Sequence, residues 1–154
     1  MSSTEIDTLR RLYTDAVDAM NGYTEALKDS DGNSIFELFD EMTECHRAAA
    51  SQLAEELIRL GEEPADGGSF MSTVHRSIMK LRSLVGGLDG SVLPGLIDGE
   101  ERNLVKYNEA LESGELNASA VTIVASQREQ LALAIARMRA ESMDRKVADL
   151  SNSR

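Results

Sequence analysis

Three side chains that can carry charge, His46, Glu100 and Arg128, stand where apolar residues are expected in amphipathic helical segments. The stretch FDEMTECHRAAASQL (39–53) has helical periodicity, and His46 lies on its apolar stripe. Glu100 and Arg128 hold equivalent positions in two later segments. An imidazole and a carboxylate can bind a metal ion, whereas a carboxylate and a guanidinium can form a buried ion pair. These residue types therefore leave two kinds of site open: a metal site and a structural polar layer.

The metal interpretation requires a particular spacing. Carboxylate di-iron bundles use a Glu from each of two helices and a Glu-x-x-His from each of the other two, because residues i and i+3 share one helix face. Thr43 stands three residues before His46, and Ser72 stands three before His75, so neither histidine has that glutamate. Since the fixed charge of Arg128 would also repel a cation, we expect no resident metal. The alternative, an iron or manganese site of atypical composition, would use Glu44, His46, Glu100 and Glu101.

Four long helices and one shorter helix are predicted to position these side chains. Apolar residues recur every three or four positions over about 4–28, 34–60, 70–85, 92–112 and 118–150. Ser34 with Glu37 forms a capping box, and Asn117 is a suitable N-cap. Gly61 and Gly114 mark the ends of two helices. We expect one all-α domain over 1–154.

The helices are predicted to form two antiparallel hairpins. Symmetry about residue 31 places Tyr23 opposite Phe39, and symmetry about residue 114 places Glu100 opposite Arg128. His46 lies at a similar distance from its turn, so all three polar residues should share one layer near mid-height. We expect Glu100 to pair with Arg128, and His46 to donate to Glu100 or to a backbone carbonyl. The long connection between the two hairpins, with its own helix, is typical of a ferritin-like four-helix bundle.

Composition excludes several classes of partner. The net charge of −11 argues against nucleic acid and against anionic membrane surfaces, which both require a basic patch. No apolar run approaches the roughly 20 residues of a membrane span, and the N-terminal residues have no apolar signal region. The single cysteine, Cys45, cannot form an internal disulfide, and we expect a buried, inert thiol. A cytoplasmic location is expected.

Three further residues could contact a ligand. His75 lies in the connecting segment, and Gly95 and Gly99 are four residues apart on one face of the helix over 92–112. Glycine inside a helix costs about 1 kcal/mol relative to alanine, so close approach of another element is expected there. A binding module for a small apolar ligand is the alternative, and it predicts an enclosed cavity near both glycines.

Two segments carry a resemblance to a known family. LIRLGEEPADGGSFMSTVHRSIMKLRSLVGG (57–87) and GLIDGEERNLVKYNEAL (95–111) resemble the bacterial ferritin-like four-helix-bundle domains of unknown function. The shared features are the RLG-x-EP end of the second helix, the HR of the connecting segment and the GE-E start of the next helix. The resemblance covers most of 5–140. It implies a ferritin-like bundle with a crossover helix, and no established reaction.

The combined interpretation is a non-catalytic, acidic, cytoplasmic ferritin-like bundle with a protein-interaction or stress-related role. A homodimer is expected, because Leu12 and Val17 lie off the main apolar stripe of the first helix and could offer a second apolar face.

Overall fold

The structure, a computed structural model, describes residues 3–28, 35–64 and 92–152. It contains four helices in these ranges: α1 (Ser3–Lys28), α2 (Ile35–Arg59), α4 (Leu93–Glu112) and α5 (Ala118–Asn152). No strand occurs in the described ranges, so the all-α prediction is confirmed there. The four helices begin and end within two residues of their predicted bounds. The helix predicted over 70–85, with His75, lies outside the described residues.

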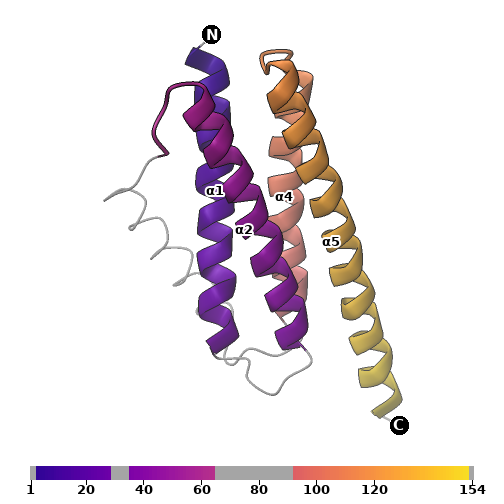
Figure 1. The fold of residues 1–154 in the computed structure, drawn as a ribbon. Helices are drawn as coiled ribbons and strands as arrows, with labels where there is room; N and C mark the ends of the chain where they lie inside the picture. Colours follow the sequence, from indigo (N-terminus) through magenta and orange to yellow (C-terminus); the bar gives the residue numbers. More distant parts are fainter. Residues whose placement is uncertain (1–2, 29–34, 65–91, 153–154) are drawn as a thin grey trace.

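The helices lie side by side as two antiparallel hairpins, α1 with α2 and α4 with α5 (Figure 1). Helix α2 contacts α5, and α1 contacts α4, which closes the bundle. Helices α2 and α4 run in the same direction, so both end at the same end of the bundle (Figure 1). Helix α5 is the longest, at 35 residues, and its C-terminal part projects beyond the other three (Figure 1).

Aliphatic and aromatic side chains from all four helices form the core. The largest fully buried apolar side chains are Leu9, Ile35, Phe39, Met42, Leu53, Leu57, Leu93, Leu131, Met138 and Val124. Burying one leucine contributes about 1.5–3 kcal/mol, so this cluster is the main source of stability. Leu12 and Val17 are only 3% and 8% exposed. They therefore face the interior and do not form the second apolar face that was expected of them.

Local signals set the helix ends. Gly61 and Gly114 have φ of 83° and 71°, the left-handed conformation that glycine adopts without steric cost after a helix. The Gly61 N–H donates to the Ile58 carbonyl at 2.9 Å. At the start of α5, the Ala120 N–H donates to Asn117 Oδ1 at 2.9 Å, which confirms the predicted N-cap. The predicted Ser34–Glu37 capping box falls partly outside the described residues.

None of the helices in the described ranges has both the length and the apolar character that a membrane span requires.

Candidate functional site

A histidine, a glutamate and a tyrosine from three helices meet in the interior. His46 of α2 places Nε2 3.1 Å and 3.2 Å from Glu100 Oε1 and Oε2 on α4. The Tyr23 hydroxyl of α1 donates to Glu100 Oε1 at 3.1 Å. The side chains of His46 and Glu100 are 3% and 8% exposed, and Tyr23 is 4% exposed. The structure therefore brings together two of the three residues expected in the polar layer, and adds Tyr23.

Hydrogen bonds from His46 and Tyr23 compensate the burial of the Glu100 carboxylate. Because Nε2 of His46 lies within hydrogen-bond distance of both oxygens of Glu100, that nitrogen is assigned as the donor. Burial, and then the neighbouring charge of Glu100, raise the pKa of Tyr23 well above its usual value, so its hydroxyl keeps its proton. The rings of Tyr23 and His46 also stack, with centroids 5.9 Å apart. Two donors from different helices thus compensate one buried carboxylate.

The predicted pair between Glu100 and Arg128 does not form. Arg128 donates from Nε to Asn108 Oδ1, and its Nη1 lies 3.9 Å from Glu129 Oε2. Its side chain is 41% exposed, so Arg128 lies outside the polar layer. This position is a correction to the sequence-based register of the second hairpin.

The prediction chose the wrong register for the second hairpin because two residues of α5 fit the same spacing. Gln127 and Arg128 each lie three or four residues from both Val124 and Leu131, so either could occupy the apolar stripe. The structure buries Gln127, which is 6% exposed. A neutral amide is less costly to bury than a guanidinium, and this difference favours the observed register. The Tyr107 hydroxyl donates to Gln127 Oε1 at 3.0 Å and fixes the alignment.

Gln127 is the centre of a second polar layer that sequence reasoning missed. Its Nε2 donates to Gln52 Oε1 at 2.9 Å and to the Ala49 carbonyl at 3.2 Å. Together with the bond from Tyr107, these contacts join α4, α5 and α2. Burial is the main cause that raises the pKa of Tyr107, so it too remains a neutral donor. The signal that could have found this layer is the alternative spacing at Gln127.

A cleft of about 440 Å³ lies between α2 and α5, beside both polar layers. Its lining includes Glu44, Cys45, His46, Gln52, Tyr107 and Gln127. Arg137 of α5 forms an ion pair with Glu41 of α2 along the same cleft. Burial, and then the charge of Glu100, raise the pKa of the partly buried Cys45 thiol. A thiol with a raised pKa is a poor nucleophile at neutral pH.

A second hollow, of about 510 Å³, lies between α1 and α4. Gly95, Gly99, Tyr23 and Glu100 contribute to its lining. Both glycines are exposed, so the hollow opens at the surface and does not match the enclosed cavity expected for an apolar ligand. A Cβ built on Gly99 would have no atom within 4 Å in the described part of the chain, so those residues supply no close approach.

The alternative set of metal ligands does not assemble. Glu44 pairs with Arg47, and Glu101 pairs with Arg139, so both carboxylates are engaged at the surface. Of the four proposed ligands, only His46 and Glu100 meet. Within the described ranges, no three side chains of His, Cys, Asp or Glu are grouped closely enough to hold a metal ion.

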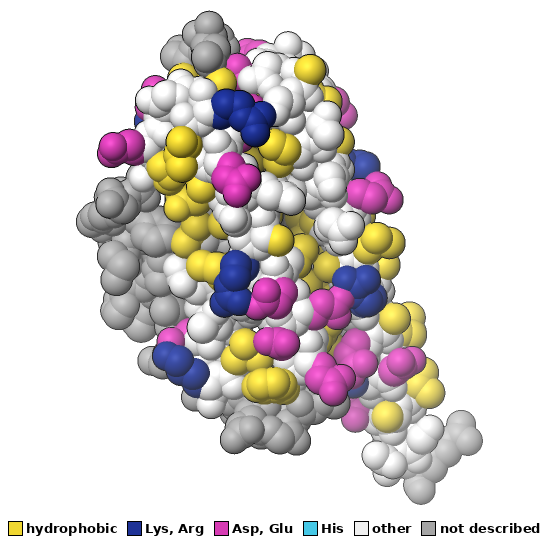
Figure 2. Space-filling view, viewed as in Figure 1, with side chains coloured by type: hydrophobic (Ala, Val, Ile, Leu, Met, Phe, Trp, Pro, Cys, Tyr) yellow, Lys and Arg dark blue, Asp and Glu magenta, His cyan; other side chains and the backbone are white. Residues whose placement is uncertain are grey.

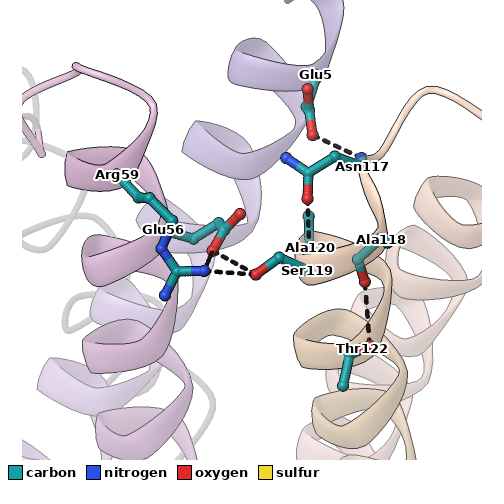
Figure 3. Close-up of polar contacts among 8 residues, drawn as sticks. All are labelled: Glu5, Glu56, Arg59, Asn117, Ala118, Ser119, Ala120 and Thr122. Carbon is teal, nitrogen blue, oxygen red and sulfur yellow. Dashed lines mark hydrogen bonds and ion pairs between the residues drawn. The ribbon is translucent and has the colours of Figure 1, made fainter.

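Two buried glutamates, Glu5 of α1 and Glu56 of α2, lie beside the N-terminus of α5, as Figure 3 shows. Glu5 Oε1 accepts the Asn117 N–H at 2.7 Å, and Glu56 Oε2 accepts from the Ser119 hydroxyl at 3.1 Å. Arg59 lies 3.2 Å from the same oxygen of Glu56. Negative charge is favourable at a helix N-terminus, so these carboxylates attach α5 to α1 and α2. Their sequence positions beside apolar stripes gave no sign of burial.

Comparisons with known proteins give one match. A search of curated proteins and a search of solved structures each found no match. A family profile described as a domain of unknown function, DUF2383, matches residues 4–113. The matched range contains Tyr23, His46 and Glu100 and ends at Ser113, directly after α4, so α5 lies outside it. Since this range is more than half of the chain, the protein belongs to the DUF2383 family.

Proposed function

We propose that this protein is a non-enzymatic helical bundle that acts by binding another protein through the outer face of α5. One observation carries the proposal: an exposed apolar stripe whose residues recur at alternating spacings of three and four. Its members are Leu133, Ala136, Ala140, Met143, Val147 and Leu150, and all six are exposed. Figure 2 shows hydrophobic side chains along α5 and on its projecting end.

The stripe, named here the α5 outer stripe, is separate from the face that α5 buries. Leu131, Ala134, Ile135 and Met138 form the buried face. At 3.6 residues per turn, the two faces point about 160° apart. Met143, Val147 and Leu150 are 61%, 56% and 70% exposed. A contiguous exposed apolar face of this kind is typical of an interaction site.

The interior supports the non-enzymatic part of the proposal. The groups able to transfer protons, His46, Glu100 and Tyr23, hydrogen-bond one another across three helices. They take the place of a packed apolar layer and link the two hairpins. Such buried polar groups stabilise a structure only when each is satisfied, as the two donors to Glu100 are.

A ferritin-like arrangement is part of the same proposal. Helices α2 and α4 run in the same direction (Figure 1), so the chain between Arg59 and Leu93 has to return from one end of the bundle to the other. A single long crossover between two hairpins is the ferritin-like connection. The absence of a resident metal is part of the proposal because the sequence lacks the Glu-x-x-His elements. A cytoplasmic location is also part of it, on the ground of the single cysteine.

Site-specific photo-crosslinking tests the function. A benzophenone amino acid replaces Met143 in the full chain, and the protein is irradiated in the cells that make it. We expect a discrete adduct whose protein component is identified by mass spectrometry. Val105 of α4, which is 51% exposed, provides the control position outside the α5 outer stripe. Adducts at neither position, or equal adducts at both, would refute a specific interaction through α5.

A further inference from the structure

The α5 outer stripe continues where the bundle no longer supports the helix. Met138 is the last buried residue of α5, and every residue from 139 to 152 is exposed or partly exposed. Helix α5 nevertheless continues to Asn152. A short helix without tertiary packing is only marginally stable in water. A partner packed on its apolar side would therefore stabilise the projecting segment.

We propose that the occupant of the α5 outer stripe is a second copy of this chain, paired antiparallel along 133–150; this inference rests on the proposed function. In an antiparallel coiled coil, residues of one apolar position face residues of the other position on the partner. The register that aligns the whole stripe with itself places Leu133 against the partner's Leu150. It also places Ala136 against the partner's Val147, and Ala140 against the partner's Met143. The paired region is about 27 Å long at 1.5 Å per residue.

Side-chain size favours the antiparallel register. Two of its three kinds of layer, each of which occurs twice by symmetry, set an alanine against a larger side chain, so the layers fill evenly along the interface. A parallel pair would set Ala136 against the partner's Ala136 and Ala140 against the partner's Ala140. Two successive alanine layers would leave space that the flanking Leu133 and Met143 layers hold open. The side chains that line such a space lose packing contacts on both helices.

Charge also favours this arrangement. The chain has a net charge of −11, which opposes association through most of its surface. The segment 133–150 is nearly neutral, because it carries Arg137, Arg139, Arg145 and Lys146 against Glu141, Asp144 and Asp149. An antiparallel pair keeps the two acidic bundles at opposite ends of the shared helices. A parallel pair would bring them side by side.

The flanks of the stripe add one attractive contact. The antiparallel register places Arg137 beside the partner's Asp144 on one flank, twice by symmetry. Arg137 already contacts Glu41 of its own chain, and a guanidinium has donors for both carboxylates. On the other flank, Arg139 faces the partner's Lys146. Arg139 is paired with Glu101 of its own chain, which reduces that repulsion.

Sedimentation equilibrium of the purified full chain is the first test. We expect a mass of twice 16.8 kDa at tens of micromolar, falling to one chain mass on dilution. The double variant Met143→Glu/Val147→Glu should be monomeric, because it puts charges into two apolar layers. Both side chains are exposed in the single chain, so the variant keeps its fold, as circular dichroism can check. Val105→Glu, an exposed change on α4, should remain dimeric. A monomeric wild type would overturn the proposal.

Disulfide trapping tests the direction of pairing. In a Cys45→Ser background, Leu133→Cys and Leu150→Cys are prepared as separate proteins. The antiparallel register predicts cross-linked dimers only when the two proteins are mixed, because residue 133 meets the partner's residue 150. Dimers formed by each protein alone would show a parallel pair and overturn the proposal.

The two proposals fail in different ways. A monomer in sedimentation that still forms a photo-adduct with a different protein overturns the self-pairing and keeps the proposed function. If the protein forms no adduct at Met143 and does not self-associate, both proposals are wrong.

Discussion

Replacing His46 with leucine is expected to lower the free energy of unfolding by about 3–5 kcal/mol. His46 Nε2 lies 3.1 Å and 3.2 Å from the two oxygens of Glu100, and both side chains are nearly inaccessible to solvent. Leucine fills a similar volume without a donor. Glu100 would then keep only the hydrogen bond from Tyr23, and a buried carboxylate with too few donors is strongly destabilising.

Urea unfolding at pH 7, followed by circular dichroism, measures this loss. The dependence of the unfolding free energy on urea for a small domain is about 1–3 kcal/mol per molar. A loss of 3 kcal/mol therefore moves the midpoint down by at least about 1 M. A change below about 1 kcal/mol would show that the contact between His46 and Glu100 does not support the fold.

A double-mutant cycle separates this pair from general packing. Glu100→Met leaves His46 and the Tyr23 hydroxyl without their acceptor, whereas His46→Leu/Glu100→Met removes the buried charge together with one donor. We expect the double variant to be more stable than His46→Leu alone, with a coupling energy of about 0.5–3 kcal/mol. Additive losses would refute the electrostatic explanation.

Three further outcomes follow from the same contacts. Arg128→Ala should lower the free energy of unfolding by less than about 1 kcal/mol, because this side chain is 41% exposed. A loss of several kcal/mol in the same urea assay would instead support the predicted ion pair between Glu100 and Arg128. Burial raises the pKa of Tyr23 and Tyr107 in the folded state above the unfolded value near 10, so their contribution is complete below pH 10 and is lost as the pH rises further. Between pH 10 and 11, urea titrations should show a decrease of about 1 kcal/mol for each tyrosine, and Tyr23→Phe should remove one of these contributions. The same decrease in Tyr23→Phe as in the wild type would contradict the buried hydroxyl. Protein loaded anaerobically with Fe(II) and then desalted should retain far less than one iron per chain by plasma mass spectrometry; near-stoichiometric iron that His46→Ala abolishes would instead make His46 a ligand.

Helix bounds could be predicted because their causes are local. Gly61, Gly114 and Asn117 act within one turn of the residues they terminate or cap. The first hairpin followed the same logic near its turn, where the rings of Tyr23 and Phe39 lie 5.7 Å apart as expected. Periodicity and caps depend on neighbours in sequence, and one chain contains all of that information.

Contacts between hairpins could not be predicted in the same way. Tyr23 belongs to the apolar stripe of its helix, and only the position of α4 beside α1 turns its hydroxyl into a donor to Glu100. The choice between Gln127 and Arg128 likewise depends on how far α5 slides along α4. Symmetry about a turn ignores such a shift. Both differences therefore concern a long-range alignment that local spacing leaves open.

The family match ends between the two helices of the second hairpin. Tyr23, His46 and Glu100 all lie within the matched residues 4–113, whereas Gln127 and the α5 outer stripe belong to the helix beyond it. Helix α5 therefore has two roles: Gln127 and its buried face complete the bundle, and its outer face presents an apolar surface. A change at Val147 or Leu150 that disrupts the proposed dimer should leave the unfolding free energy of the single chain almost unchanged, because neither side chain is buried in it. In the proposed dimer, assembly and folding would therefore depend on opposite faces of one helix.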